Sequence, residues 1–287
     1  MLSAVVSSAR ERGEEAVVVT FWPHPRTVLQ QDAREFRILT SLEEKKALLL
    51  AAGIDRVEVI PFTREFAAMK ADEYLQLLAD KYGASLVVMG YDNRIGSDKL
   101  TAEEICISQA VASRPLPTSL RSVGPLPFTW PRAAMVSEDS NAPVISSTKI
   151  RKALTEGRVE EANGMLGYRY GLYGAVVAGN QLGRTIGFPT ANMQLYEPLK
   201  LVPANGVYAV EAEVLGTTYK GMCNIGMRPT VGGTSRTIET HILDFNQDIY
   251  GLPLRIRFVR RVRDERKFPS LDALREQLTL DALNCKK

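Results

Sequence analysis

One glycine-rich segment has the spacing and the polar end of a ligand-binding loop. Gly179, Gly183 and Gly187 stand four residues apart and leave the backbone free to fold closely around a ligand. Thr190 and Asn192 follow two residues apart, so in an extended stretch their oxygens lie on one face. A hydroxyl and an amide oxygen suit Mg²⁺ on a nucleotide. Spacing alone leaves a phosphate or metal loop and a turn-rich structural loop open, and no P-loop motif occurs.

A second candidate site is a carboxylate beside an imidazole. Glu239 and His241 alternate with Ile238 and Ile242, so they share one face of a predicted strand. Such a pair could act as a general base that removes a proton from an attacking hydroxyl. The solvent face of a barrel strand explains the same pattern without chemistry. Both interpretations stay open at this point.

Hydroxyl side chains gather at the expected start of a helix. Ser146, Ser147 and Thr148 precede the basic side chains of Lys149 and Arg151 in the first turn. Free N–H groups at a helix start attract a phosphate. Capping explains the hydroxyls, but it does not favour basic residues at that end. An anion site and a plain helix cap therefore remain alternatives.

Two further basic features are weaker signals. His24 stands between two prolines directly after the first predicted strand, at the edge where α/β sheets bind ligands, although a structural role explains it equally. Seven basic residues, Arg263 among them, lie between positions 255 and 267. A solvated face with salt bridges explains this cluster, and an anion site that uses one of its members is the alternative.

Composition excludes several classes of protein. The 287 residues are 45% hydrophobic and 24% charged, which is typical of a globular chain with room for two domains. The net charge of +3 gives no support to nucleic acid or a membrane as partner. No apolar run approaches the roughly 20 residues that cross a bilayer, and we expect no secretory signal at the start. Three cysteines without a CxxC motif suit reduced thiols, so we expect a cytoplasmic protein.

The N-terminal half alternates strand and helix patterns. Apolar runs predict strands at residues 16–21, 57–60, 85–89 and 133–136. Helices are expected at residues 2–11, 41–52, 74–82, 101–112, 148–156 and 159–166. The strands are too apolar to have a solvent-exposed face. The alternation of strands and helices therefore predicts an α/β domain with a parallel sheet.

From residue 168 the pattern changes to a period of two with turns. Strands are expected at residues 173–178, 206–214, 218–224, 237–243 and 254–262, followed by an amphipathic helix at 270–278. This spacing is typical of a small antiparallel barrel or sandwich. The predicted fold class is therefore α/β followed by β.

Short motifs follow one another along nearly the whole chain. They lie at residues 20–25 (TFWPHP), 39–45, 61–63 and 145–151, and then at 183–192 (GRTIGFPTAN), 206–208, 224–230, 248–251 and 263–268. In this order the motifs resemble those of the bacterial bifunctional riboflavin kinase/FAD synthetase family. The resemblance implies a Rossmann-like nucleotidyltransferase domain over residues 1–165 and a six-stranded antiparallel barrel over residues 166–287.

The resemblance also implies site residues for a kinase that moves the γ-phosphoryl of ATP onto the 5′-hydroxyl of riboflavin. Thr190 and Asn192 would hold Mg²⁺ and the ATP phosphates, and Gly183 to Gly187 would close over the nucleotide. Glu239 would be the base, and Arg263 lies in a segment near the flavin. Phosphoryl transfer asks a protein mainly for positioning and charge neutralisation, which these residue types supply.

The family's N-terminal domain joins FMN and ATP into FAD through an H-x-G-H motif and a Ser-Ser-Thr-x-x-Arg segment. The second is present as Ser146, Ser147, Thr148 and Arg151. The first is absent, because the only histidines are His24 and His241. Residues 91–96 also depart from the family's Asp-Phe-x-Phe-Gly pattern. We expect that the sequence begins after the family's opening strand, that His24 contacts a nucleotide without replacing the two histidines of the motif, and that FAD formation is impaired.

Two alternatives accompany this interpretation. A longer natural chain would be a fully bifunctional enzyme. A non-catalytic flavin- or nucleotide-binding protein would bind riboflavin without consuming ATP, but the intact Thr190, Asn192 and Glu239 favour a kinase. Nucleic-acid binding ranks below both, because the basic cluster lacks interleaved aromatic residues.

Overall fold

The computed structural model describes residues 2–29, 36–89, 93–101, 104–105, 145–179, 182–230 and 233–286. The chain divides into two compact units, which are described separately. The first comprises Met1–Phe36 and Leu42–Pro143, and the second comprises Arg37–Ser41 and Val144–Lys287. The predicted strand at 133–136, most of the predicted helix at 101–112 and residues 91–92 of the divergent motif lie outside the described residues.

The first unit contains a parallel pair of strands, as the sequence predicts. β1 (Val17–Trp22) pairs with β2 (Arg56–Pro61), from Val17 opposite Arg56 to Trp22 opposite Pro61. The described helices of this unit are α1 (Leu2–Arg12), α2 (Pro25–Leu29), α3 (Leu42–Ala51), α4 (Arg64–Ala68) and α5 (Ala71–Tyr82).

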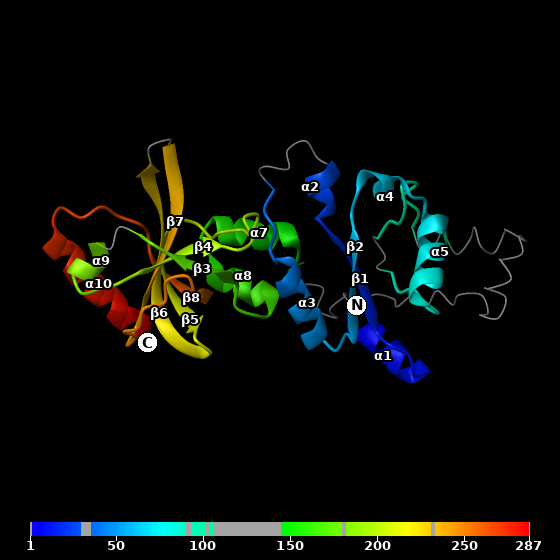
Figure 1. Cartoon of the computed structure of the whole chain (residues 1–287), viewed down its shortest axis with the longest axis horizontal. Coiled ribbons are helices and arrows are strands. Elements are labelled where there is room, and N and C mark those ends of the chain that lie inside the picture. Colours follow the sequence, from blue (N-terminus) through cyan, green and yellow to red (C-terminus); the bar gives the residue numbers. More distant parts are fainter. Residues whose placement is uncertain are drawn as a thin grey trace, which may run out of the picture. The chain divides into compact units, whose positions relative to one another are not determined.

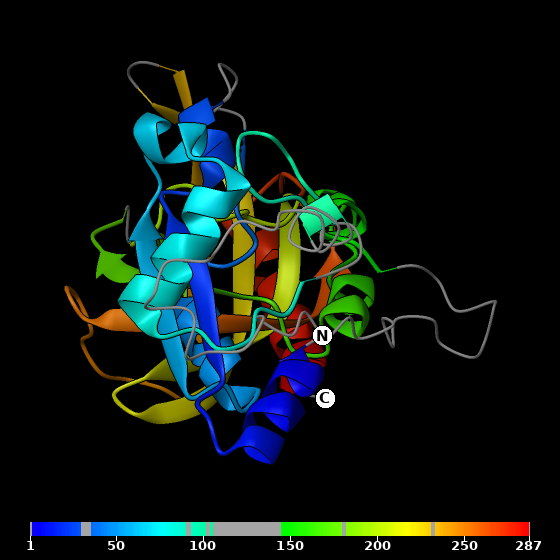
Figure 2. The ribbon, with the colours of Figure 1, turned by 90° about the vertical axis from the view of Figure 1, so that its right-hand side faces the viewer.

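Alternate residues of β1 pack on opposite sides of this sheet. Val18 joins a small core with Ala9 of α1 and Leu49 of α3. Val19 packs in a different core with Leu75 of α5. α3 and α5 accordingly lie on the two sides of β1 and β2 in Figure 1, and α5 lies in front of β1 in Figure 2. The period of two in the strand therefore gives each helix its own apolar partner.

The third predicted strand, at residues 85–89, is wrong. These residues form no strand and instead line a cavity of about 990 Å³ together with β1. Val17, Val18 and Val19 all line it, as do the successive residues 86–89. Because successive side chains of a strand point to opposite faces, this lining places the cavity along the edge of β1 that β2 does not occupy. No strand of the described residues pairs with this edge.

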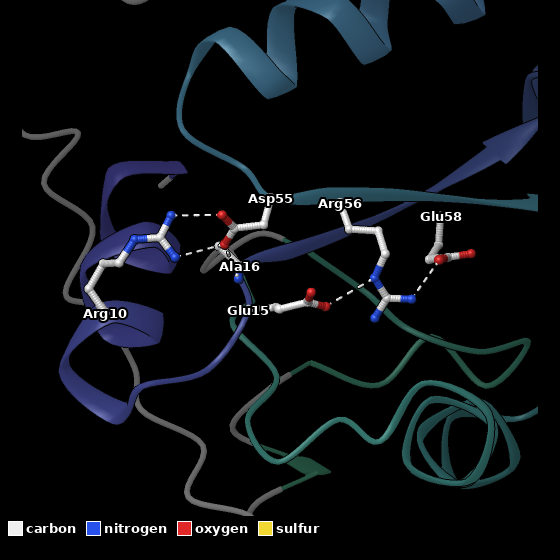
Figure 3. A network of polar contacts seen from close by, with 6 residues as sticks. All are labelled: Arg10, Glu15, Ala16, Asp55, Arg56 and Glu58. Atoms are coloured by element: carbon white, nitrogen blue, oxygen red, sulfur yellow. Dashed lines mark hydrogen bonds and ion pairs between the residues drawn. The ribbon is translucent and has the colours of Figure 1, made fainter.

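A polar network ties α1 to the start of the sheet (Figure 3). The Asp55 carboxylate accepts hydrogen bonds from both terminal nitrogens of Arg10 and from the Ala16 N–H, each at 2.8 Å. These donors lower the pKa of Asp55 from its ordinary value to about 2, with the Arg10 hydrogen bond as the largest cause. Beside it, Arg56 donates to Glu15 at 3.2 Å. The network fixes the first turn into β1.

The second unit is a closed six-stranded barrel with helices before and after it. Its strands are β3 (Gly171–Val177), β4 (Ala191–Leu195), β5 (Gly206–Val214), β6 (Thr217–Thr230), β7 (Gly233–Ile242) and β8 (Pro253–Arg263). They close in the order β3-β4-β7-β6-β5-β8, every pair antiparallel. Its described helices are α7 (Ser147–Thr155), α8 (Val159–Leu166), α9 (Leu182–Thr185) and α10 (Leu271–Lys286). The predicted barrel is confirmed, whereas the predicted domain limits at 165 and 166 stay a prediction.

Alternation along the strands separates an inner core from an outer face. Inward residues such as Leu172, Ile238 and Ile256 form the barrel core. Outward residues such as Met222 join a second cluster with Leu278 of α10. α10 therefore covers part of the outer face of the barrel.

Residues 37–41 pack with the second unit by backbone pairing. Ile38 donates its N–H to the Leu199 carbonyl at 2.9 Å and accepts from the Leu201 N–H at the same distance. The buried Lys200 Nζ donates to the Leu39 carbonyl at 2.7 Å. This segment thus belongs structurally to the barrel unit, although it precedes α3 in the chain.

Candidate functional site on the outer face of the barrel

The strand register aligns three polar side chains in one row on the outer face of the barrel. Asn192 on β4 lies opposite Glu239 on β7. Glu239 in turn lies opposite Asn224 on β6. All three are half-buried, and directly opposed side chains have Cβ atoms about 5 Å apart. The carboxylate of Glu239 is therefore flanked by two carboxamides. We call Asn192, Glu239 and Asn224 together the polar row.

The row continues across the next two strands to Arg263. Val207 on β5 lies opposite both Asn224 on β6 and Arg263 on β8. Neighbouring strands are about 4.8 Å apart, so Arg263 belongs to the same belt of the barrel surface as Glu239. The register thus brings together residues that are up to 71 positions apart in the sequence.

Thr190 and Asn192 share the outer face, as their spacing predicts. Ala191 between them is buried in the barrel core, whereas both neighbours are half-buried on the outside. The Asn192 side chain lies against bare backbone, because a Cβ at Gly179 would stand 2.2 Å from its Nδ2. Any residue with a Cβ at position 179 would therefore displace the Asn192 side chain from its observed place.

The loop from Gly183 to Thr190 is tightly closed on itself. The Phe188 N–H donates to the Gly183 carbonyl at 2.7 Å, and a Cβ at Gly183 would meet the Phe188 oxygen at 2.2 Å. Gly187 has a φ of +85°, which favours glycine, and its Cβ position faces open space. Gly183 and Gly187 are thus both explained by the loop itself.

His241 anchors this loop to the barrel. Its Nδ1 donates to the Pro189 carbonyl at 2.8 Å, and its ring packs edge-on against Phe188, with centroids 5.2 Å apart. His241 lies on the same outer face as Glu239, as the alternation predicts. Its hydrogen bond indicates that it positions the loop beside Thr190.

The donor atoms of the site fit a magnesium ion that also binds phosphate. Thr190, Asn192 and Glu239 offer hydroxyl, amide and carboxylate oxygens, all hard donors. Among the described residues no group of three or more His, Cys, Asp or Glu could hold a metal by itself. Mg²⁺ commonly takes few protein ligands and completes its shell with water and substrate phosphates, so this sparse donor set is compatible with it.

Arg263 is held from the side of α10. Its Nε and Nη2 donate to Oδ2 of Asp281 at 2.9 and 2.7 Å. Asp281 is 1% exposed and also accepts from Nε2 of Gln277 at 2.7 Å. Sequence reasoning missed Asp281, because the predicted helix ended at residue 278.

Glu265 is a second residue that sequence reasoning did not single out. A Cβ at Gly226 would stand 2.2 Å from the Glu265 Oε1 and 3.3 Å from the Asn224 Nδ2. The carboxylate therefore lies over the bare backbone of Gly226, beside the Asn224 end of the polar row. Glu265 lies in the motif at residues 263–268, and this motif is the sequence feature that could have indicated it as a site residue.

The residues expected at an ATP site of the N-terminal domain lie in both compact units. Ser146 caps α7 by accepting from the Lys149 N–H at 3.3 Å, whereas Ser147 and Thr148 are exposed. Arg151 donates from Nε to the Arg37 carbonyl at 3.0 Å. These residues belong to the second unit. The cap and the Arg151 contact are structural roles that the structure shows, and anion binding here stays a prediction.

His24 lies just after β1 in the first unit. Its Nδ1 accepts a hydrogen bond from the Arg26 N–H at 3.2 Å, and its ring stands 4.7 Å from that of Phe36. These contacts order the turn into α2. The position at the carboxyl end of a parallel strand agrees with the expected ligand edge, and a nucleotide contact stays a prediction.

Comparison with known proteins covers both halves of the chain. A riboflavin kinase family model matches residues 166–287, and an FAD synthetase family model matches residues 1–113. The bifunctional riboflavin kinase/FMN adenylyltransferase of Bacillus subtilis is 35% identical over 95% of this chain and 82% of its own length. That of Escherichia coli K12 is 32% identical over 100% of this chain and 87% of its own length.

A solved structure is similar over the same extent. A crystal structure described as a macrolide-efflux protein from Streptococcus pneumoniae matches with a TM-score of 0.82 and 32% identity, over 100% of this chain and 88% of the other. Among the described residues, no helix has the length and apolar character to cross a membrane. Taken with the motifs, the barrel and the parallel strands, these similarities show that the chain belongs to the bifunctional riboflavin kinase/FMN adenylyltransferase family.

Proposed function

We propose that this chain is a riboflavin kinase that transfers the γ-phosphoryl group of ATP to the 5′-hydroxyl of riboflavin. Glu239 accepts the hydroxyl proton, the freed oxygen attacks the γ-phosphorus, and the bond to ADP breaks, giving FMN. Thr190 and Asn192 hold the ATP phosphates together with Mg²⁺, which neutralises their charge. Arg263 lies at the flavin side of the site.

The observation that carries this proposal is the polar row. It sets Asn192 and Glu239 in direct opposition on paired strands, with Arg263 on the same belt. A base must lie within hydrogen-bond reach of its proton, and phosphoryl transfer depends on holding donor and acceptor in line. One rigid barrel surface provides that positioning at little entropic cost.

The direct test is to incubate the purified chain with riboflavin, ATP and Mg²⁺ and to separate the flavins by chromatography. We expect FMN. Glu239→Gln should lower turnover by about 10² to 10⁴-fold while riboflavin still binds, because only the proton acceptor is lost. Glu213→Gln is the matched control, since Glu213 lies on β5 and pairs with Arg257 outside the row. Unchanged turnover in Glu239→Gln would remove this residue from the mechanism.

We further infer that FAD formation by this chain is impaired. The 287 residues contain no H-x-G-H motif, and their only histidines are at positions 24 and 241. The same chromatography tests this point: FMN without FAD supports it, and abundant FAD contradicts it. The remaining alternative is a non-catalytic flavin-binding protein. Such a protein would quench riboflavin fluorescence and consume no ATP, which distinguishes it from a kinase.

We also infer a reducing, cytoplasmic setting. Cys223 and Cys285 are free thiols and both are buried, which is typical of proteins from reducing compartments. Burial raises the pKa of the Cys223 thiol to about 12, so it carries no reactive thiolate at neutral pH. Fractionation of cells that make the protein checks the location, and recovery outside the cytoplasmic fraction would contradict it.

A further inference from the structure

Asp281 on α10 is a buried carboxylate that accepts hydrogen bonds from Arg263, at one end of the kinase site, and from Gln277 on the same helix. A charge that is 1% exposed is tolerated only when hydrogen-bond donors surround it. Arg263 supplies two of these donors to Oδ2, and Gln277 supplies one to Oδ1. Arg263 is thereby held in one orientation, because its Nε and Nη2 form a fork onto a single carboxylate.

Arg263 in turn holds the chain that follows β8. Its Nη1 donates to the Asp264 carbonyl at 3.0 Å. Its guanidinium lies 5.6 Å from the centroid of the Phe268 ring, and that of Arg266 lies 4.9 Å from the same ring. The side chain that Asp281 orients therefore contacts both ends of the segment 264–268.

This segment reaches the polar row through Glu265. The Glu265 carboxylate lies over Gly226 and beside the amide of Asn224, the direct neighbour of Glu239. Its Oε2 also accepts from the Asn205 Nδ2 at 3.3 Å. The segment thus borders the end of the row that is opposite to Thr190 and the glycine loop.

Apolar packing between the segment and α10 is incomplete. A groove of about 360 Å³ separates them, lined by residues 266–269 and by α10 residues that include Gln277 and Leu280. Polar contacts therefore hold this segment to the helix, namely those of Arg263 with Asp281 and of Arg266 with Oε1 of Gln277.

We propose that Asp281 is a positioning residue of the kinase reaction. Through Arg263 it fixes segment 264–268 against the Asn224 end of the row, and its loss weakens the binding of riboflavin more than that of ATP. The ATP side is spared because Thr190, Asn192 and the glycine loop lie at the other end of the row. This inference rests on the proposed function of the barrel as a riboflavin kinase.

The test is a double-mutant cycle of Asp281→Leu and Arg263→Met, with thermal unfolding and steady-state kinetics measured on the full chain. Each single change leaves a buried partner unpaired and lowers the unfolding temperature. The double variant removes both charges and regains most of that stability. We expect the riboflavin KM of the double variant to be about tenfold higher than that of the unmodified chain. Its ATP KM should differ by less than about twofold.

If Asp281 had only a structural role, the activity of the double variant would return together with its stability. A double variant with the riboflavin KM of the unmodified chain would therefore overturn the proposal. If the double variant does not fold, Asp281→Asn, which keeps the shape and one acceptor oxygen, takes its place with the same kinetic criterion. Absence of FMN formation by the unmodified chain would reject the kinase function itself, which is a distinguishable failure.

Discussion

The two compact units differ in how they bring distant residues together. In the barrel, six closed strands fix one register, and Asn192, Glu239 and Asn224 are aligned across three of them. In the first unit, β1 pairs with β2 alone among the described strands, and the residues expected at its ATP site are divided between His24 and the start of α7. A closed sheet thus specifies a site through its hydrogen bonds, whereas an open pair of strands leaves its site to other contacts.

After the Glu239 variant, the largest expected effect tests whether the Asn192 side chain needs a residue without a Cβ at position 179. Gly179→Ala would place a Cβ 2.2 Å from the Asn192 amide and displace that side chain. We expect FMN formation to fall by about 10²-fold, because small displacements of positioning groups have effects of this size. Steady-state turnover is the measurement.

Gly164→Ala in α8 is the matched control for this change. Its Cβ would meet nothing within 4 Å, and its φ lies outside the glycine region. We expect unchanged turnover and a gain of about 0.5 to 1 kcal/mol in stability from the lower backbone entropy of the unfolded chain. Equal loss of activity in both variants would contradict the role of Gly179.

A smaller effect is expected where the loop is fastened to the barrel. His241→Ala removes the hydrogen bond to the Pro189 carbonyl and the ring contact with Phe188. We expect the KM for ATP to rise by about tenfold, since the loop beside Thr190 is released. His241→Asn can still donate to the carbonyl and should recover part of the affinity. A KM that is the same in all three proteins would exclude the anchoring role.

A change at the start of α7 separates stability from catalysis. Ser146→Ala removes the cap of the Lys149 N–H, which should lower the free energy of unfolding of the barrel unit by about 1 kcal/mol. FMN formation should stay unchanged, because Ser146 is no part of the polar row. Denaturant unfolding and kinase assays on the same sample check both statements, and a clear loss of FMN formation would connect this cap to the kinase.

The smallest expected effect concerns acid stability in the first unit. The pKa of Asp55 is lowered to about 2 by its donors, so its contribution is complete above the ordinary value near 4 and is lost as the pH falls through 2. The pair with Arg10 is partly exposed, which keeps this contribution modest. The protection factors of the α1 amides, which correct for the intrinsic pH dependence of hydrogen exchange, should fall between pH 4 and 2, and Asp55→Asn should abolish this change. An identical pH profile in the variant would contradict the assignment.

Sequence reasoning predicts elements well where local patterns and packing agree. The helix at 159–166 and the strand at 206–214 have the observed bounds, because capping glycines, turns and alternation all act locally there. The predicted strands omit β4, because its five residues offer only a short alternating set, Ala191, Met193 and Leu195, to the core. Residues 85–89 have the composition of a strand, but pairing depends on a neighbour that composition does not reveal.

The candidate site shows the same division. Thr190, Asn192 and Glu239 were found from spacing and resemblance, and their shared outer face follows from alternation within each strand. Asn224 was missed as a site residue because its place beside Glu239 depends on the register between β6 and β7. Asp281 was missed because nothing in an amphipathic helix pattern indicates that a polar residue near its end will be buried against Arg263.

The edge of β1 that pairs with no strand among the described residues has a practical consequence for handling the protein. Its six residues, VVVTFW, contain no charge and no proline, and thus none of the sequence features that discourage another molecule from hydrogen bonding to a strand edge. We expect concentrated samples to scatter light through edge-to-edge association of first units, at temperatures where the barrel still makes FMN. A gatekeeper lysine on β1 is no remedy, because Val18 packs in the core beside α1 and Thr20 is buried, so either substitution would bury a charge; dilute storage is the better protection.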